Sequence, residues 1–263
     1  MRVTYYGYNA FILDDGDRKL AVDPGANLFL LTMKSLIPAS EWSTVTHVLV
    51  THADPDHYWY ADRVANRSGA PVICNRAMIR ERNSTAVLIA PRRGGLTFTT
   101  EVERVLPIAP SETIDSDGVR VTGIRTTHGP LKLRVGPFRK TFSPGRDSRT
   151  GWGSIGFEIR TGPRVIVVLG DTLLEKASWQ EIRNPDLLIV PIGGSRIPNT
   201  MNEDEALEAV NAMRPVVVIP CHYDCPGFFT TNANPADVMT FKTKCERTGS
   251  ICMVMRRNES IEI

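Results

Sequence analysis

The sequence predicts an α/β fold, with β-sheets in the middle of the molecule and helices outside them. Three observations favour this architecture: short apolar segments typical of strands recur along all 263 residues, helical patterns occur in both halves, and the last third alternates strand with helix. A chain of this length can bury a sizeable core. We therefore expect a single domain over residues 1–263, which two similar halves could build.

Strands dominate the first half of the chain. Its first 25 residues alternate short apolar segments with turns that contain Gly and Asp, which predicts strands at 3–6, 10–13 and 19–22. A continuous apolar segment predicts a further strand at 47–51, and the residues at 58–68 have a helical pattern. More strands are expected at 72–74, 102–108, 119–125, 154–159, 164–169, 187–191 and 216–220.

The carboxyl-terminal part is predicted to alternate strands with helices. Asn202 and Glu205 have the spacing of a capping box, which indicates the start of a helix, and Pro215 ends it. An amphipathic pattern predicts a second helix at 235–248, and a closing strand is expected at 251–255.

Composition excludes several classes of protein. The net charge is +2 with a pI near 8.3, which is too mild to indicate a nucleic-acid-binding protein. No apolar segment approaches the roughly 18 residues of a membrane-spanning helix, and the amino terminus lacks the pattern of a secretion signal. The five cysteines are scattered and odd in number, which favours free thiols in a reducing compartment. We therefore expect a soluble, cytoplasmic protein without a membrane partner.

The most informative segment is THADPDH at 51–57, which places His52, Asp54, Asp56 and His57 close together. Imidazoles and carboxylates packed this tightly are costly to hold together unless a cation neutralises and orders them. Taken alone, the segment could also be a solvated acidic turn with helix-capping residues. Three further candidate ligands argue against that alternative, because each follows an apolar segment typical of a strand: His128, Asp171 and His222.

The spacing of these residues suits two metal ions. His52 and Asp54 are two residues apart, so in an extended loop they can point the same way and bind one ion, which His128 would complete. The adjacent pair after them, Asp56 and His57, suits a second ion together with His222. Asp171 can bridge the two ions with its two carboxylate oxygens. Such a pair of ions can activate a shared water and hold both oxygens of a bond that is hydrolysed.

The order and context of these residues resemble the metallo-β-lactamase superfamily. Its signature is His-x-His-x-Asp-His after a strand, followed by His, by Gly-Asp and by His, each at a strand end. The matching segments here are 51–57, 127–129, 170–172 and 220–223. This resemblance implies a four-layer αβ/βα sandwich, with two central mixed sheets and helices outside.

A smaller branch of that superfamily is also similar. The segment VTYYGYNAF at 3–11, the Asp23-Pro24 pair, and the segments 191–194 and 200–206 look like the branch that contains the ascorbate-6-phosphate lactonase. The resemblance implies a dinuclear hydrolase in which a bridging hydroxide opens a lactone or another ester of a small, anionic substrate. Phosphodiester cleavage is the second substrate class. Zn or Mn is the expected metal and Fe the alternative. Asp56 and Asp171 are the expected catalytic residues, and Tyr223, which follows a ligand, is a third candidate as an oxyanion donor.

One position departs from the family pattern, because Asp54 stands where the family usually has its second His. A carboxylate is a harder ligand than imidazole, so the first site should shift toward Mn, Fe or Mg relative to Zn. Some members of the superfamily with a carboxylate here are di-iron redox proteins, which makes an oxygen- or electron-handling protein the alternative function. Another alternative is that Asp54 does not coordinate and that one site is weak.

Other residues have both a functional and a structural interpretation. The basic segment 130–150, with Lys132, Arg134 and Arg139, could be a loop that attracts an anionic substrate, a solvated hairpin, or a contact between copies in a homo-oligomer. Gly193 and Gly194 could let the backbone approach a substrate or form a plain turn. The structural interpretation is favoured for three others: His47 in a strand, Cys221 as a buried thiol, and Tyr223 as a packing residue rather than an oxyanion donor.

Overall fold

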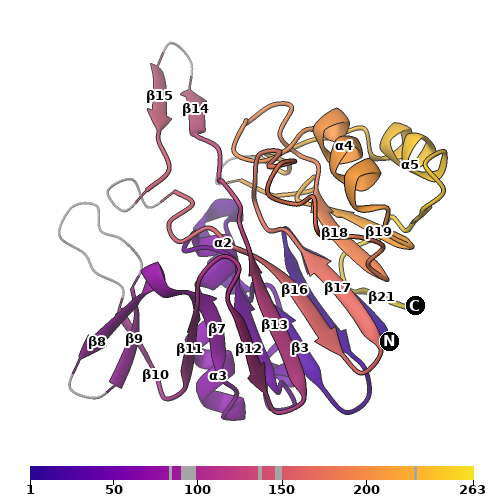
Figure 1. Cartoon of the computed structure of the whole chain (residues 1–263). Coiled ribbons are helices and arrows are strands. Elements are labelled where there is room, and N and C mark those ends of the chain that lie inside the picture. The colour runs from indigo at the N-terminus through magenta and orange to yellow at the C-terminus, as the bar shows by residue number, and fades with distance from the viewer. Residues whose placement is uncertain (83–84, 90–98, 136–137, 146–149, 228–229) are drawn as a thin grey trace.

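Two seven-stranded sheets packed face to face form the centre of the molecule (Figure 1). The computed structural model describes residues 1–82, 85–89, 99–135, 138–145, 150–227 and 230–263. The apolar residues that face each other across the two sheets come from both ends of the chain, from Val3 in the first strand to Met255 near the last. The predicted strands therefore build two sheets that share one core.

The first sheet combines the amino-terminal strands with the last strand of the chain. Its order is β11 (Val105–Ile108), β7 (Val72–Asn75), β6 (His47–Val50), β3 (Lys19–Val22), β2 (Ala10–Asp14), β1 (Arg2–Gly7) and β21 (Glu259–Glu262). The four strands from β11 to β3 run parallel, whereas β2, β1 and β21 continue the sheet in antiparallel pairs. The sheet is therefore mixed, as predicted.

The second sheet is also mixed. Its order is β12 (Thr113–Ser116), β13 (Val119–Ile124), β16 (Gly156–Thr161), β17 (Arg164–Val168), β18 (Leu187–Pro191), β19 (Val217–Cys221) and β20 (Ile251–Cys252). Antiparallel pairs join β12 to β17, and parallel pairs join β17 to β20. Because β16 is antiparallel to both of its neighbours, β13, β17 and β19 all run in the same direction. Their carboxyl ends therefore lie at one edge of the sheet.

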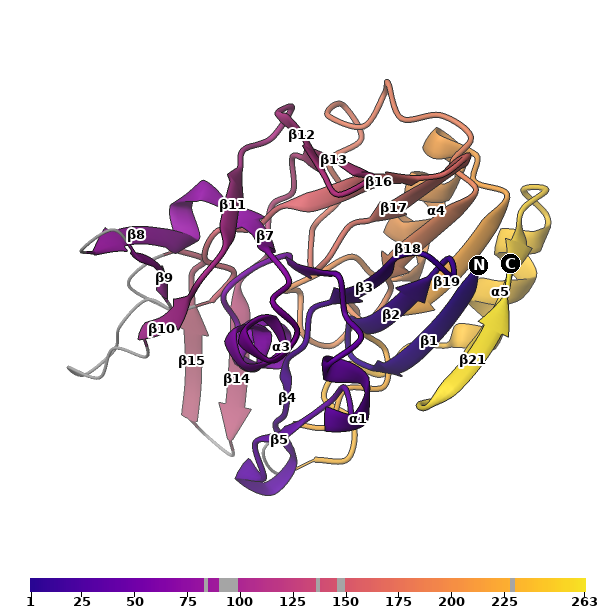
Figure 2. The same cartoon turned by 90° about the horizontal axis from the view of Figure 1, so that it is seen from below.

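Helices cover the outer face of each sheet. Ala61, Val64 and Ala65 of α3 (Ala61–Ser68) pack on the outer face of the first sheet, where α1 (Ala39–Trp42) also lies (Figure 2). Residues of α4 (Glu203–Met213) and α5 (Val238–Glu246), such as Val210 and Phe241, pack on the outer face of the second sheet. The predicted four-layer αβ/βα sandwich is confirmed.

Local sequence explains where the helices begin. The predicted capping box of α4 is present, because the Asn202 side chain accepts from the backbone of Glu205 and the Glu205 side chain accepts from the backbone of Asn202. The helix predicted at 58–68 is instead two helices, α2 (Pro55–Tyr58) and α3, which Trp59 and Tyr60 separate. Pro55 occupies the first turn of α2, where its missing N–H costs nothing.

Several short strands and turns lie outside the two main sheets. Five short strands of two to five residues lie outside the main sheets in the described part of the amino-terminal half: β4 (Ala26–Asn27), β5 (Lys34–Ser35), β8 (Ile79–Arg82), β9 (Thr85–Ile89) and β10 (Thr99–Val102). Two 3₁₀ turns accompany them, at Phe29–Leu31 and Arg76–Met78. Strands β14 (Leu131–Val135) and β15 (Phe138–Phe142) pair only with each other and project from the sandwich (Figure 1). Among the described residues, no helix is long and apolar enough to cross a membrane.

Candidate metal centre

The predicted ligands meet at the end of the sandwich where four strands finish. His52, Asp54, Asp56 and His57 follow β6, and His128, Asp171 and His222 follow β13, β17 and β19. Three groups of these residues place one ligand atom from each member within 4.8 Å of the others: His52 with His57 and Asp171, His52 with Asp54 and His128, and Asp56 with His57 and His222. The structure therefore brings together all seven of the predicted ligands.

Asp54 belongs to the first of the two predicted sites. Its Oδ2 atom lies 3.6 Å from the Nε2 atoms of both His52 and His128. Its Oδ1 atom accepts a hydrogen bond of 2.8 Å from the backbone N–H of Gly151, whose left-handed φ of 60° suits glycine. Asp54 stands before α2, yet its side chain makes no capping hydrogen bond. The interpretation of this carboxylate as a helix cap is therefore wrong.

The second predicted site has the same composition of one carboxylate and two imidazoles. Asp56 Oδ2 lies 3.6 Å from His57 Nε2 and 3.9 Å from His222 Nε2. The backbone of His222 has a left-handed φ of 54° and donates its N–H to Tyr8 O at 3.0 Å. This contact and the close approach of Gly193 to the His222 carbonyl fix where the last ligand points, because a Cβ on Gly193 would lie 1.9 Å from that oxygen.

Asp171 lies between the two sites. Its Oδ2 atom is 3.8 Å from His128 Nε2, 3.9 Å from His57 Nε2 and 2.9 Å from His222 Nε2. Its Oδ1 atom accepts a hydrogen bond of 2.8 Å from Asn9 Nδ2. Oδ2 thus lies within 3.9 Å of imidazole nitrogens of both predicted sites. The role of Asp171 as a bridge between two ions stays a prediction.

Hydrogen bonds fix the orientation of three of the imidazoles. His57 Nδ1 lies 2.8 Å from Asp23 Oδ2, and His128 Nδ1 lies 2.6 Å from Gly129 O. His52 Nδ1 lies 3.1 Å from the Thr51 hydroxyl, which itself donates to Asp23 Oδ2 at 2.7 Å and can therefore only accept from the ring. This pattern assigns the neutral rings as Nδ1–H tautomers, each with a free lone pair on Nε2.

The donor set fits metal ions. The Nε2 atoms of His52, His57 and His128 are buried and have no hydrogen-bond partner among the described residues. A buried polar atom without a partner costs about 1–3 kcal/mol, so three that converge beside carboxylates indicate a site that binds a cation. Imidazole nitrogens whose other nitrogen is held by a carboxylate or carbonyl are the usual ligands of catalytic metal ions. Nitrogen with carboxylate oxygen suits Zn, Mn or Fe.

Without a metal, the crowded charges shift the ionisation of the ligands strongly. Burial and the neighbouring His57 lower the pKa of His52 to about 3. Burial also acts to lower the pKa of His57, but the carboxylates of Asp56, Asp23 and Asp171 raise it to about 9. Burial raises the pKa of Asp54 to about 6, against the effect of His128. The shifts in opposite directions show that the cluster is electrostatically unbalanced, as expected of a cation site.

Four supporting residues were not identified from the sequence as part of the site. Asn9, Asp23, Asn199 and Gly151 each bond to a ligand side chain. The segments with Asn9 and Asp23 carried the resemblance to the lactonase branch, and that was the available signal for these two. Asn199 and Gly151 lie in loops without a recognisable pattern, so only the folded structure reveals their contacts.

The residues predicted to bind substrate or to assist catalysis lie in three different parts of the structure. The Tyr223 hydroxyl donates to Met255 O at 3.0 Å, which supports the packing interpretation over that of an oxyanion donor. Gly194 packs against the backbone of Thr200. Lys132 and Arg139 are exposed on the projecting hairpin of β14 and β15. The side chain of Arg134 and residues 146–149 lie outside the part of the chain that the structure describes.

The structural interpretations of His47 and of the cysteines agree with the structure. His47 is buried, and its ring nitrogens lie 3.0 Å from the Thr46 hydroxyl and 3.0 Å from Ser116 O, away from the ligand groups. Cys221 is buried in the core between the sheets. All five cysteines are buried and unpaired, so the prediction of free thiols is confirmed.

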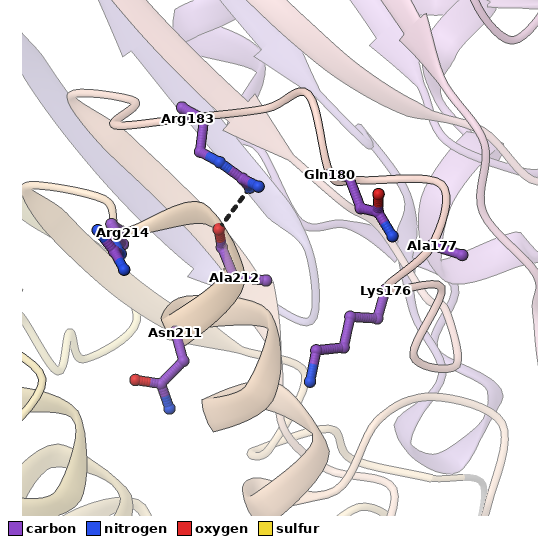
Figure 3. A pocket seen from close by; sticks show the side chains of 7 residues that line it. All are labelled: Lys176, Ala177, Gln180, Arg183, Asn211, Ala212 and Arg214. Carbon is purple, nitrogen blue, oxygen red and sulfur yellow. Dashed lines mark hydrogen bonds between the residues drawn. The ribbon is translucent and has the colours of Figure 1, made fainter.

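A separate cavity of about 600 Å³ lies between α4 and the residues around 176–183 (Figure 3). Two of its basic side chains have structural partners: Arg183 donates to Ala212 O at 2.7 Å, and Lys176 pairs with Glu208 at 3.3 Å. Cations at the carboxyl end of a helix satisfy its free carbonyls. We therefore assign Arg183 to the end of α4 and Lys176 to an ion pair on its side, and we assign no ligand to this cavity.

Comparison with known proteins agrees with this site. Residues 2–222 match the family model described as the β-lactamase superfamily domain. The chain belongs to the metallo-β-lactamase superfamily. It is 31% identical over 225 residues to a UPF0173 metal-dependent hydrolase of Aeropyrum pernix, which covers 84% of this chain and 82% of that protein. The chain is accordingly a metal-dependent hydrolase of this superfamily.

Solved structures of the same fold are also similar. Igni18, described as a novel metallo hydrolase from Ignicoccus hospitalis, has a TM-score of 0.68 at 22% identity and covers 99% of this chain and 97% of that one. CmlA, a diiron β-hydroxylase from Streptomyces venezuelae, has a TM-score of 0.65 at 15% identity and covers 100% of this chain and 54% of that one. At these identities the two structures show the shared fold alone.

Proposed function

We propose that the protein hydrolyses a lactone or another ester of a small, anionic molecule at a centre of two divalent metal ions. The observation that carries this proposal is the pair of ligand groups that share the neighbourhood of Asp171, each with one carboxylate and two imidazoles. His52, Asp54 and His128 would hold one ion, and Asp56, His57 and His222 the other. When bound, two such ions lower the pKa of a shared water and polarise the oxygen of the electrophile.

The residues of the chain have separate roles in this proposal. Asp23 and Thr51 keep the imidazoles of His57 and His52 in the tautomer that presents Nε2 to the centre. The Gly151 N–H holds Asp54 in place. Asp56 is the most accessible candidate for moving a proton in the second group, because its side chain is 14% exposed whereas that of Asp171 is 2% exposed.

Two observations support the proposed substrate class: the sequence resemblance to the lactonase branch and the basic hairpin. The resemblance of the amino-terminal and 191–206 segments to the lactonase branch supports an ester, with a phosphodiester as the second class. The exposed Lys132 and Arg139 support an anion, since their hairpin follows the segment of His128. Buried free thiols in all five cysteines support a reducing compartment such as the cytoplasm.

The first test measures the metal content of protein purified without chelator, together with hydrolysis of a panel of lactones and phosphate esters. We expect about two Zn or Mn ions per chain, as the two ligand groups provide. Asp171→Ala should abolish hydrolysis and lower the metal content while circular dichroism shows an intact fold. An active Asp171→Ala protein with its full metal content would refute the shared centre.

A di-iron redox protein is the second candidate, and the position of Asp54 favours it. A carboxylate within 3.6 Å of two imidazoles gives the first site the hard, anionic donor that iron accepts readily. Two iron ions per chain and a visible absorption band that disappears on reduction would support this candidate. Two Zn ions without such a band, together with ester hydrolysis, would exclude it.

A further inference from the structure

Three buried asparagine side chains from three different segments form a hydrogen-bond network around Asp171, which two of them contact directly. Asn9 Nδ2 donates to Asp171 Oδ1 at 2.8 Å, and Asn199 Nδ2 donates to Asp171 Oδ2 at 3.1 Å. Asn234 does not touch Asp171, but its Nδ2 atom donates both to Asn199 Oδ1 at 3.1 Å and to Gly193 O at 3.1 Å. Their exposed fractions are only 1%, 7% and 5%, respectively. Each oxygen of Asp171 thus accepts from one amide.

The direction of this hydrogen-bond chain follows from one backbone atom. A carbonyl oxygen can only accept, so the Asn234 atom beside Gly193 O must be the NH₂ group. That same NH₂ group faces Asn199, which must therefore turn its carbonyl oxygen toward Asn234. The remaining half of the Asn199 amide, its NH₂ group, must then face Asp171. A fixed acceptor in the backbone thereby ensures that a donor reaches the ligand.

We propose that Asn234 is a positioning residue for the metal centre, and that it acts by holding the Asn199 amide in the orientation that donates to Asp171. The inference deepens the proposed function and rests on it, because it assigns the residues that prepare Asp171 to bind ions. With Asn199 on Oδ2 and Asn9 on Oδ1, the carboxylate cannot rotate freely, and Oδ2 remains turned toward His57, His128 and His222.

The opposite orientation of Asn199 would work against metal binding. Its carbonyl oxygen would then lie near a carboxylate oxygen, and two acceptors without a proton between them repel each other. Asp171 would rotate to escape that contact. Residues that hydrogen-bond to a metal ligand without touching the metal typically contribute about 10- to 100-fold to metal affinity. We expect a loss of that size when the direction of the chain is reversed.

Asn234→Asp tests the direction of the chain without touching a metal ligand. The substitution keeps the size of the side chain but places an oxygen where the NH₂ group donated to Gly193 O and to Asn199 Oδ1. Titration of the chelator-treated protein with Mn²⁺ and with Zn²⁺ should show about 10- to 100-fold weaker binding. Asn199→Asp, which removes the donor at Asp171 directly, should weaken binding at least as much.

Asn202→Asp is the matched control. It makes the same chemical change in the same part of the chain, but Asn202 caps α4 through its side-chain oxygen, which aspartate retains. Its metal affinity should equal that of the unsubstituted protein. Thermal unfolding of all three variants separates loss of the fold from loss of the site. If Asn234→Asp is unstable, Asn234→Ala, which only frees Asn199 to turn, should give a smaller loss.

A second measurement decides the inference even if the unsubstituted protein binds no metal. The side-chain amide resonances of Asn199 in the metal-free protein should move in Asn234→Asp and stay unchanged in Asn202→Asp. An unsubstituted protein without metal affinity would refute the proposed function alone. An Asn234→Asp protein that folds, binds Mn²⁺ and Zn²⁺ normally and leaves the Asn199 resonances unmoved would overturn the positioning role.

Discussion

At the scale of single residues, the sequence revealed the residues that gather in the candidate metal centre, but it did not reveal most of the residues that bond to them. His52, Asp54 and Asp56 could be found because metal ligands have a restricted chemistry and a short spacing. Asn199 could not, because asparagine is common in loops and its contact with Asp171 spans 28 positions of the chain. Only the fold brings such residues together. The partners of a ligand are therefore less visible in a sequence than the ligand itself.

We expect Asp54 to set the metal preference of the first predicted site. Its carboxylate Oδ2 lies 3.6 Å from both His52 Nε2 and His128 Nε2, so it contributes a hard oxygen donor among nitrogens. We predict that Asp54→His raises the affinity for Zn²⁺ relative to Mn²⁺, because imidazole is the softer ligand. Competition titrations with the two metals check this. An unchanged ratio of the two affinities would show that Asp54 does not coordinate.

Asp23 orients His57, one of the predicted metal ligands. Its Oδ2 atom accepts from His57 Nδ1 and from the Thr51 hydroxyl, while Oδ1 accepts from the Thr51 N–H. Asp23→Asn replaces one of these two acceptor oxygens by an NH₂ group and removes the negative charge that holds the His57 Nδ1 proton. We predict a folded protein with about 10- to 100-fold weaker metal binding. Metal titration checks this, and normal affinity would disprove the tautomer assignment.

At the scale of elements, periodicity predicted most strands of the two sheets, because buried strands are short apolar segments between turns. The sequence did not reveal β12, β21 or the small sheet of β8, β9 and β10. β12 and β21 lie at the edges of their sheets, and their alternation of exposed with partly buried residues leaves no continuous apolar segment. The break between α2 and α3 was missed for a related reason, because Trp59 and Tyr60 have no helix-breaking chemistry.

The turn after β18 shows how a loop determines the position of a ligand. A Cβ on Gly193 would lie 1.9 Å from the His222 carbonyl oxygen and 2.8 Å from Asn234 Cβ. We predict that Gly193→Ala displaces the His222 loop, costs about 1–3 kcal/mol of the free energy of unfolding, and weakens metal binding. Urea unfolding and metal titration measure the two effects. A variant with unchanged stability and affinity would contradict this close packing.

At the scale of the whole molecule, the two halves of the chain contribute different parts of the centre. The first sheet supplies the segment of His52 to His57, and the second sheet supplies His128, Asp171 and His222. The core between the sheets is apolar, so the charged ligands gather only where the strands end. Without a bound cation, the charged side chains from the first sheet and those from the second sheet would lie close together and would not be neutralised. Metal binding and stability of the sandwich should therefore be coupled.

This coupling predicts a characteristic dependence on pH. Despite burial, the neighbouring carboxylates raise the pKa of His57 to about 9, and Asp171 raises the pKa of His222 well above its usual value. A histidine whose pKa rises on folding stabilises the folded state fully below its unfolded pKa near 6.5, and this contribution is lost as the pH rises through the folded pKa. The metal-free protein should therefore lose stability between about pH 6.5 and pH 9.

Metal binding should reverse that trend, because the ion requires the neutral imidazoles and its affinity rises as His57 and His222 lose their protons. Thermal unfolding with chelator and with saturating Zn²⁺, measured from pH 6.5 to 8.5, checks both arms. The difference in Tm between the two arms should widen with pH. Calorimetry in buffers of different ionisation enthalpy should also show protons released on binding at pH 7. A constant difference in Tm, or binding without proton release, would show that the imidazoles are already neutral in the metal-free centre.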